Sequence, residues 1–433
     1  MDGNLDRSDD AAHPASSPES QLDVVREMNS VTLRERLVGA LWKPWLVQAL
    51  RDYHPIVRFN GLILLTRYDD VRALLEHDQI FHVEGQRIFE ASGGSGFLLG
   101  MQDDTRCPFS RLYGNEPTRL VSGYRDFQAL VMKHFPLEDL ERVQQVLRKH
   151  ADTHVQLGHT LDAASKLITG AAIAVCREYY GIDVREKDED DFANCTFAIS
   201  RWYFDPKRDT RYAQLGAAQS KRLDRMIDVA IARARREPRD TVLDRLVQQA
   251  LPEPKIRAII SGMIVGFVPT STMAATHMLQ VLLSNAHARS AAQAAARAND
   301  DARLERCLFE ALRFKPLVRE PLRVCKQPFT FAEGTRHAFT VQPGERVLGL
   351  MASALMVERR VHNPKQFNPD RPLYQSFLLG SGLHRCIGAP IATLHAVHTL
   401  RPLLLSNDLR EVPNSSGQDA MCSPFLKHLF VQI

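Results

Sequence analysis

The segment "LLGSGLHRCIGAP", residues 378–390, places three glycines, one histidine and one cysteine directly before an apolar, helix-like pattern. Gly380 and Gly382 permit a tight turn that approaches a flat object, and Gly388 permits close packing where the helix starts. Cys386 falls near that helix N-terminus, where backbone N–H groups and the helix dipole stabilise a thiolate. A thiolate is a nucleophile or a metal ligand, so the segment predicts chemistry at Cys386.

Other roles for Cys386 have weaker support. A free cysteine is commonly a small buried hydrophobe, but the glycine-rich setting argues against that role. A nucleophile needs a positioned base, and His384 is near in sequence without a guaranteed contact. A structural zinc site would recruit His395 and His398, three residues apart on the predicted helix, yet such sites use four ligands and usually a second cysteine.

The bulk composition is that of a soluble globular protein. Of the 433 residues, 44% are hydrophobic and 24% charged, and the formal net charge is +4. No dense Lys/Arg run with interleaved aromatic residues appears, so we expect no nucleic-acid partner. Seven widely spaced cysteines without a Cys-x-x-Cys motif argue against a disulfide framework. These features predict a cytoplasmic protein.

The N-terminal segment is polar and acidic, and composition predicts a disordered tail over residues 1–25. It lacks the basic and apolar regions of a signal peptide. The best apolar run, "AIISGMIVGFVP" at 258–269, is too short to span a bilayer and ends in proline, so we expect no membrane anchor. No break in composition divides residues 26–433, which we expect to form a single domain.

Hydrophobic periodicity predicts a mainly α domain with a small β part. An Asn60-Gly61 pair between two apolar runs predicts a hairpin, and Asp69 and Asp70 are expected to cap the next helix. Residues 85–123 have weak periodicity and are expected to be loop. The other expected elements are mostly helix over 124–244, a long apolar helix over 255–285, a helix over 301–316, short strands over 317–350, loop over 357–385, and a final helix over 387–404.

"LGSGLHRCIG", residues 379–388, resembles the haem-binding signature of the cytochrome P450 family. Gly382, His384, Cys386 and Gly388 match that signature at the required spacing. Leu379 stands where the family has phenylalanine, which changes the packing beside the sulfur without removing the ligand.

Two further segments carry the same resemblance. "EALR", residues 310–313, is similar to the family's Glu-x-x-Arg, with Glu310 and Arg313 on one helix face. "FNPDRP", residues 367–372, is similar to the element that supplies a second arginine, here Arg371. "LILLTRYDDVRALL" also resembles the family's first sheet strand and its following helix. Without the other motifs, Glu310 and Arg313 would be interpreted as an ordinary ion pair on the surface of a helix.

The resemblance implies the cytochrome P450-like fold and haem b as cofactor, with Cys386 as the iron ligand. By position, His384 and Arg323 resemble the family's propionate partners, although a solvated role is the plain alternative for Arg323. A further partner is expected from the first third of the chain. Arg125 is our candidate there, with Arg119 or an ordinary surface role as the alternatives.

The helix over 255–285 resembles the family's oxygen-binding helix, but its acid–threonine pair is altered. In the alignment that keeps Gly266, Val268 replaces the acid, Pro269 the first threonine, and Thr270 keeps the second. Valine cannot carry a proton, and proline kinks a helix. Thr270 or Thr272 would then hold water and relay protons, and a shift of one residue changes which threonine faces iron.

The resemblance implies a haem-thiolate monooxygenase that oxidises an apolar small molecule with electrons from a separate ferredoxin- or flavodoxin-type partner. The altered helix leaves open a hydroperoxide-using peroxygenase or a lipid-hydroperoxide isomerase, and outside enzymes a non-catalytic haem-binding protein. An aromatic pocket wall could be formed by Phe81, Phe97, Phe109 and Trp202, for which core or loop packing is the more common role.

Overall fold

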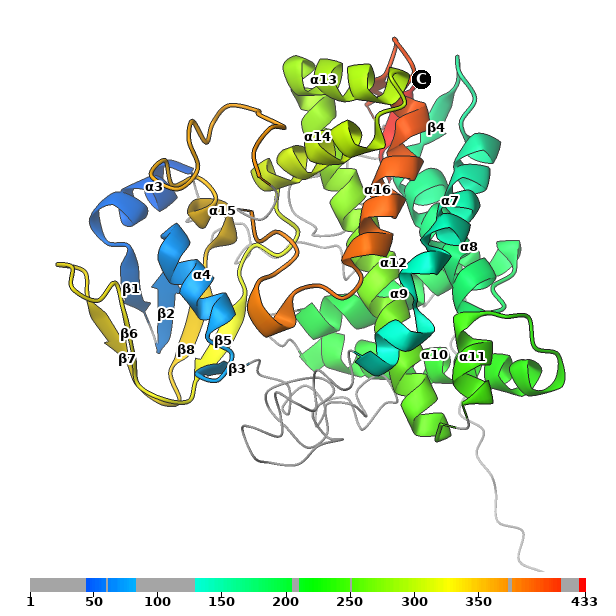
Figure 1. Ribbon diagram of the computed structural model, residues 1–433, viewed down its shortest axis with the longest axis horizontal. Coiled ribbons are helices and arrows are strands. Elements are labelled where there is room, and N and C mark those ends of the chain that lie inside the picture. The colour runs from blue at the N-terminus through cyan, green and yellow to red at the C-terminus, as the bar shows by residue number, and fades with distance from the viewer. Residues whose placement is uncertain are drawn as a thin grey trace, which may run out of the picture.

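The computed structural model describes residues 44–59, 61–82, 129–204, 210–249, 251–372, 376–413 and 428–433. A small sheet-rich part lies beside a larger helical part (Figure 1). This arrangement confirms the expected fold, mainly α with a small β part. The expected tail over residues 1–25 and the loop expected over 85–123 lie outside the described residues, so both stay predictions.

The small part is built on a five-stranded sheet of order β1-β2-β8-β5-β3. Its strands are β1 Ile56–Phe59, β2 Leu62–Leu65, β8 Arg346–Gly349, β5 Leu322–Cys325 and β3 Phe81–His82. The predicted hairpin is confirmed: β1 and β2 pair antiparallel, and Gly61 adopts a φ of +75° that favours glycine. β2 and β8 pair in parallel, so this sheet joins the start of the chain to its last third.

Two helices cover this sheet, α4 (Tyr68–Glu76) and α15 (Met351–Ala354). The expected caps of α4 were wrong, because Arg67 occupies the N-cap position and no side chain caps the helix. Asp69 instead pairs with Arg359 and Arg360 at 3.1 and 2.7 Å. Asp70 is only 5% exposed, and its Oδ2 has no hydrogen-bond partner among the described residues.

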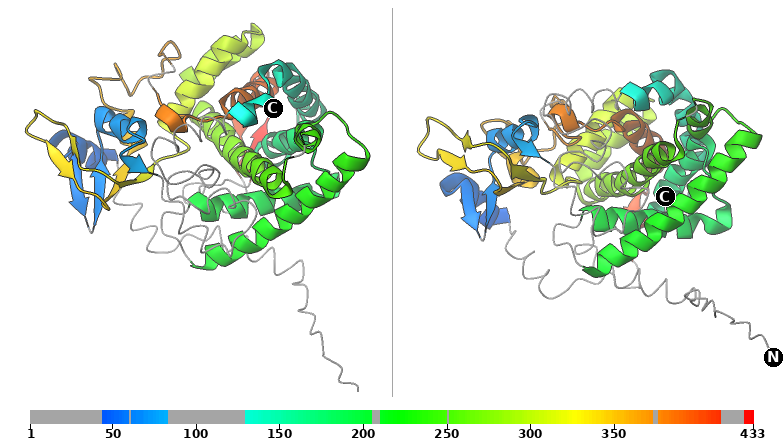
Figure 2. Two further views of the ribbon diagram at one scale, coloured as in Figure 1. Left: turned by 60° about the horizontal axis from the view of Figure 1, so that its bottom comes forward. Right: turned by 90° about the horizontal axis from the view of Figure 1, so that it is seen from below.

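The helical part surrounds one central helix, α12 (Glu253–Ser284), and the long α10 lies along its outer side (Figure 2). The other helices here are α7 Leu140–His154, α8 Gly170–Val175, α9 Glu189–Phe204, α10 Thr210–Arg236, α11 Val242–Gln248, α13 Ala286–Arg297, α14 Asp301–Phe314 and α16 Ala389–Leu404, with α3 Pro44–Tyr53 beside the sheet. The remaining strands are β4 Thr160–Asp162, β6 Phe329–Phe331, β7 Phe339–Val341, β9 Arg410–Glu411 and β10 Phe430–Gln432. Short 3-10 and π segments are η3 Leu137–Asp139, η4 Ala163–Thr169, η5 Cys176–Tyr180, η6 Glu186–Asp188 and η8 Gly382–His384.

α12 continues through Pro269, so the proline does not end the helix. Because proline has no N–H, the Val265 carbonyl receives no donor from position 269. Within the described part of the chain, α12 is the one helix that is long and apolar enough to cross a membrane, by length and composition only. However, 67% of its most apolar stretch is buried. Both hydrophobic clusters of the protein include residues of α12, so it is the core helix.

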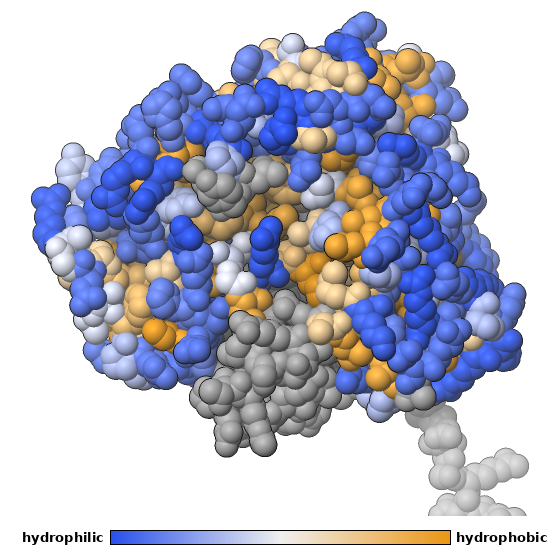
Figure 3. Space-filling model, viewed as in Figure 1, coloured by the Kyte–Doolittle hydropathy of each residue, from blue (hydrophilic) through white to orange (hydrophobic). Residues whose placement is uncertain are grey.

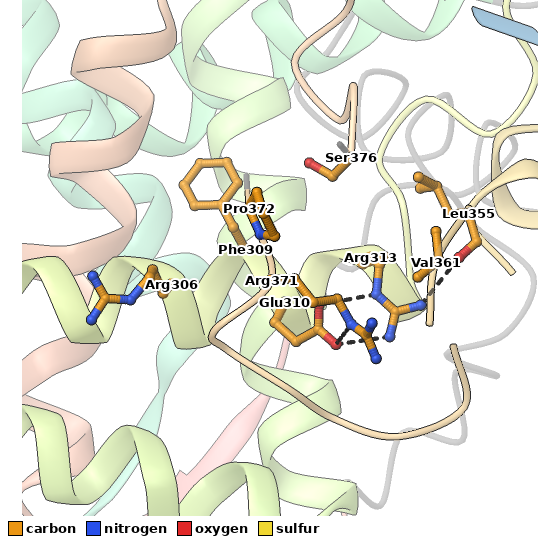
Figure 4. A pocket seen from close by; sticks show the side chains of 9 residues that line it. All are labelled: Arg306, Phe309, Glu310, Arg313, Leu355, Val361, Arg371, Pro372 and Ser376. Atoms are coloured by element: carbon orange, nitrogen blue, oxygen red, sulfur yellow. Dashed lines mark hydrogen bonds and ion pairs between the residues drawn. The ribbon is translucent and has the colours of Figure 1, made fainter. Parts of the chain in front are cut away.

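A buried ion-pair cluster joins α14 to the loop-rich segment before Cys386 (Figure 4). Glu310 accepts hydrogen bonds from Nε and Nη2 of Arg313 at 3.0 and 2.8 Å. The same carboxylate accepts Arg371 Nε at 3.1 Å and the Asn368 N–H at 3.1 Å. The alternative of a surface pair is therefore wrong for Glu310 and Arg313, which are 5% and 2% exposed.

The two arginines also bind backbone carbonyls, which fixes the course of the loop. Arg313 donates to Leu355 O at 3.2 Å, and Arg371 donates to Asn363 O at 2.8 Å and to His362 O. Each buried charge is thus both paired and hydrogen-bonded, as burial of charge requires.

We expect Glu310→Gln to destabilise the haem-loaded protein by about 3–5 kcal/mol, because it leaves two guanidinium groups without their anion in a buried site. Urea unfolding followed by circular dichroism measures the change. The control is Asp370→Asn, which breaks the exposed pair with Arg303 on the same helix and should cost at most about 1 kcal/mol. Equal effects of the two variants would contradict the prediction.

We expect Asp70→Asn to stabilise the protein at pH 7. Burial raises the pKa of Asp70 to about 6, above the value of about 3.9 in an unfolded chain. Folding therefore favours the protonated acid, and the stability of the wild type falls as pH rises between these two values. The gain should be about 1–3 kcal/mol at pH 7 and should vanish below about pH 4. Denaturant titrations at both pH values test this, and a gain independent of pH would refute it.

Candidate functional site

The loop that carries Cys386 leads into α16, whose N-cap residue is Gly388. It is preceded by the loop-rich segment that contains Asn363 and Arg371, which we call the meander. The Cys386 N–H donates to Leu379 O at 2.7 Å and closes the loop. Leu379 itself is partly buried and packs against the hydrophobic core, so the residue that departs from the family signature has an ordinary packing role. Figure 1 shows this segment, in orange, reaching from α16 toward α4.

Two glycines of the loop are required by its backbone, as the sequence predicted. Gly380 and Gly382 adopt φ values of +80° and +67°, which side-chain-bearing residues rarely adopt. A Cβ at Gly380 would stand 2.9 Å from His384 O. A Cβ at Gly382 would stand 2.9 Å from Leu75 O, so the surface that Gly382 approaches in the protein is the end of α4. Gly388 is less constrained, because a Cβ there would meet Cys386 Sγ at an ordinary 3.8 Å.

Cys386 is the exposed member of the described cysteines; the other four are Cys176, Cys195, Cys307 and Cys325, all buried. The protein around its sulfur nevertheless raises the pKa of the Cys386 thiol, and only the Gly388 N–H acts in the opposite direction. The helix N-terminus alone therefore does not produce the thiolate that the sequence predicted. Coordination to a metal ion deprotonates a thiol outright, so this environment suits a ligand better than a free nucleophile.

A hollow of about 880 Å³ opens beside Cys386. It lies between the turn after α4, the helical residue Met132, and the Cys386 loop with the start of α16. Its volume is in the range of protein cofactor and ligand sites. On the face drawn in Figure 3, apolar residues gather in the middle, between the polar surfaces of the two parts.

One face of α12 is open around Gly266. A Cβ at Gly266 would meet no atom within 4 Å, and Thr270, one turn later on the same face, is partly exposed. The Thr270 hydroxyl donates to Gly266 O. Val268 and Pro269 are both buried, and Val268, two residues after Gly266, lies on the opposite side of the helix.

Thr272 is also turned away from the open face. It is 3% exposed, and its hydroxyl donates to Thr169 Oγ1 in η4 at 3.3 Å. Of the two threonines selected from the sequence, Thr270 is therefore the one that shares a face with Gly266. The signal available in the sequence was the four-residue spacing between Gly266 and Thr270, which places them on one side of a helix.

The cysteine side of α16 packs against the same stretch of α12. Ile387 and Ile391 belong to the hydrophobic cluster that contains Val265 and Phe267 of α12. Tyr180 links the two sides, because its ring lies 6.0 Å from that of Phe267 and the Cys386 sulfur acts on the pKa of its hydroxyl. Cys386 and the Gly266 segment thus belong to one region of the molecule.

A polar group surrounds His384. His384 Nε2 lies 3.7 Å from Asp78 Oδ1 in the turn after α4. Burial, together with the smaller effects of the nearby Arg323 and His82, lowers the pKa of His384 to about 4. His384 is therefore a neutral hydrogen-bond donor at pH 7, while Arg323 on β5 carries the positive charge. Arg125 and Arg119 lie outside the described residues, so their roles stay predictions.

The zinc alternative has no support. Where the structure describes side chains, no group of three His, Cys, Asp or Glu residues could hold a metal ion. His395 and His398 are both buried, with His395 Nε2 at 2.9 Å from Ile168 O and His398 Nδ1 accepting from Arg148 at 3.4 Å.

Two of the proposed pocket aromatics are core residues. Phe81 is fully buried and lies 5.2 and 5.3 Å from the rings of Phe329 and Phe331. Trp202 is 5% exposed and packs against Gly216 of α10, where a Cβ would meet the indole at 2.7 Å. Phe97 and Phe109 lie outside the described residues.

The residues present fit a haem. Cys386 lines a hollow of sufficient size and is the donor, Gly266 leaves open space beside α12, and the partly buried Arg323 is a counter-charge close to His384; this cofactor needs all three.

Comparison with known proteins agrees with a haem-binding site. A family model described as Cytochrome P450 matches residues 195–430, just over half of the chain. Cytochrome P450 119 of Sulfurisphaera tokodaii is 38% identical over 87 residues, which are 20% of this chain and 22% of that protein. Cyclomarin C epoxidase CymV of Salinispora arenicola is 22% identical over 81% of this chain and 85% of its own.

The structural likeness covers nearly the whole chain. The solved structure of cytochrome P450 TbtJ1 superposes with a TM-score of 0.70 at 21% identity, over 91% of this chain and 97% of that one. The chain spans only about a fifth to a half of the length of the first three curated relatives that it matches. The fold, the cysteine loop and the family match together lead to one conclusion: this chain belongs to the cytochrome P450 family, whose members bind haem b.

Proposed function

We propose that this protein is a haem-thiolate monooxygenase in which Cys386 ligates the iron and the open face of α12 borders the reaction space. The observation that carries the proposal is the placement of an exposed Cys386, on a glycine-constrained loop, in the same region as the open Gly266 face. The bound haem supplies oxygen activation, which an electron-donating thiolate ligand favours.

The protein's own residues hold the cofactor. Cys386 would ligate the haem iron, and the hydrogen bond from its N–H to Leu379 O keeps the cysteine backbone in place. We assign His384 to a propionate as a neutral N–H donor and Arg323 to a propionate as a cation, because both lie together at the sheet side of the loop. Arg125 is proposed as a third partner on the family resemblance alone.

We assign proton delivery to Thr270. Its hydroxyl is held by Gly266 O on the open face, whereas Thr272 is buried against η4. In the alignment that keeps Gly266, Val268 stands in the position of the family's acid and Pro269 in that of the first threonine, so no carboxylate precedes Thr270. Water held by the Thr270 hydroxyl must then bring protons from elsewhere.

This missing acid favours a second candidate, a peroxide-using route. A peroxide arrives already reduced, so it needs fewer delivered protons than dioxygen does. A lipid-hydroperoxide isomerase belongs to the same alternative. A non-catalytic haem-binding protein is the least favoured, because the open face retains its hydroxyl.

The substrate is proposed to be an apolar small molecule. Relatives are named as an epoxidase of cyclomarin C and a hydroxylase/epoxidase of mycinamicin IV, and one solved relative from Bacillus megaterium is in complex with corticosterone. We further propose a cytoplasmic location and a separate ferredoxin- or flavodoxin-type electron donor, on the same resemblance.

Cys386→Ala should abolish the thiolate-type Soret band of the reduced protein under carbon monoxide, because no other exposed cysteine occurs in the described part of the chain. A difference spectrum of purified protein measures this. The control is Cys307→Ala, which alters a buried cysteine of α14 and should leave the band in place. An unchanged band in Cys386→Ala would refute the assignment of the ligand.

Thr270→Ala should separate the two oxygen routes. With a reductase and dioxygen, we expect product formed per electron pair to fall roughly tenfold or more, since proton transfer by a positioned group contributes at least that much. With hydrogen peroxide alone, the yield should change little. Thr272→Val is the matched control and should affect neither.

If wild-type protein turns over substrate with peroxide but not with a reductase, the peroxide route is the correct one. A reductase-driven yield unaffected by Thr270→Ala would contradict the role of Thr270.

A further inference from the structure

The loop that carries the iron ligand is fastened to the turn after α4. The Ser381 hydroxyl donates to Glu76 Oε1 at 2.7 Å. The Leu383 N–H donates to Asp78 Oδ2 at 2.9 Å. Between these two bonds, Gly382 lies so close to the backbone of Leu75 and Glu76 that a Cβ would not fit.

The two oxygens of Asp78 serve different groups of the loop. Oδ2 accepts the Leu383 N–H, while Oδ1 lies 3.7 Å from His384 Nε2. One carboxylate therefore faces both the backbone of η8 and the imidazole that we assign to a propionate. The positive charge of Arg323 acts on the same carboxylate from β5.

The turn itself is well anchored. Glu76 also accepts Arg72 Nε at 2.8 Å, one helical turn back along α4. Val71 and Leu74 of α4 are buried against the sheet, where a Cβ on Gly349 of β8 would stand within 3.2 Å of them. The contacts of Glu76 and Asp78 thus tie the loop to a packed element rather than to a free surface strand.

We propose that Asp78 is a positioning residue for the Cys386 thiolate: its carboxylate docks the loop on α4 and orients His384. This inference rests on the proposed function. Without the acceptor, the Leu383 N–H loses its partner in a half-buried site, which costs free energy and releases the segment three residues before the ligand. The loop then reaches arrangements in which the sulfur no longer binds iron.

The test follows the thiolate-type Soret band of the reduced carbon monoxide complex in mild guanidinium and measures how fast it is lost. Asp78→Ala should lose the band about tenfold faster than wild type, which corresponds to about 1.4 kcal/mol, within the range for an unsatisfied buried donor. Haem transfer to an excess of apomyoglobin should accelerate in parallel. Asp78→Asn keeps an oxygen acceptor for the Leu383 N–H and should stay close to the wild-type rate.

The matched control is Asp69→Ala, at the other end of the same helix, where the carboxylate pairs with Arg359 and Arg360. It should leave the rate unchanged. Leu383→Pro removes the same hydrogen bond from the loop side, so it should accelerate the loss as Asp78→Ala does. The double variant should be no faster than either single variant, because both delete one interaction.

A wild-type rate in Asp78→Ala would overturn the proposal. Should Asp78→Ala give no folded haem protein, Leu383→Pro carries the test, and a wild-type rate in that variant has the same meaning. If the wild-type protein shows no thiolate-type band at all, it is the proposed function that fails, so the two failures are distinguishable.

Discussion

One buried carboxylate, that of Glu310, holds together the segment that leads to the Cys386 loop. It holds Arg313 on its own helix and Arg371 on the meander, and the two guanidinium groups hold carbonyls of that meander in turn. Cys386 follows Arg371 by fifteen residues. The course of an otherwise irregular segment is thus set by charge and hydrogen bonding instead of by regular secondary structure. A loop of this kind keeps its geometry because each of its buried charges is satisfied.

Much of the site could be predicted because its constraints are local. The positive φ at Gly380 and Gly382 follows from residue type, and the Glu310–Arg313 pair follows from helical spacing. The hairpin around Gly61 could be predicted from the sequence in the same way. The sequence suggested that Cys386 would be a thiolate because it lies at a helix start, but desolvation of the sulfur by neighbouring protein atoms raises the pKa of the thiol. Electrostatics of this sort depend on residues distant in the chain.

The other features of the site could not be predicted, because they depend on contacts between residues that are distant in the chain. Nothing local indicates that Gly382 approaches Leu75, more than three hundred residues earlier, or that Asp78 accepts a bond from Leu383. Asp69 and Asp70 have the residue types of helix caps, but tertiary contacts place one among arginines and bury the other. For α12, the sequence alignment that keeps Gly266 did not decide whether Thr270 or Thr272 faces the reaction space. In the structure, Thr270 shares the side of Gly266, and the Thr272 hydroxyl instead contacts Thr169.

The parallel pairing of β2 with β8 has a consequence for the order of events during synthesis. Leu62 pairs with Arg346, so the sheet that supports α4 cannot be completed until most of the chain has left the ribosome. Contacts between such distant segments close large loops and form slowly. The turn after α4, which holds the cysteine loop through Asp78, therefore gains its full support only when the last third of the chain is available.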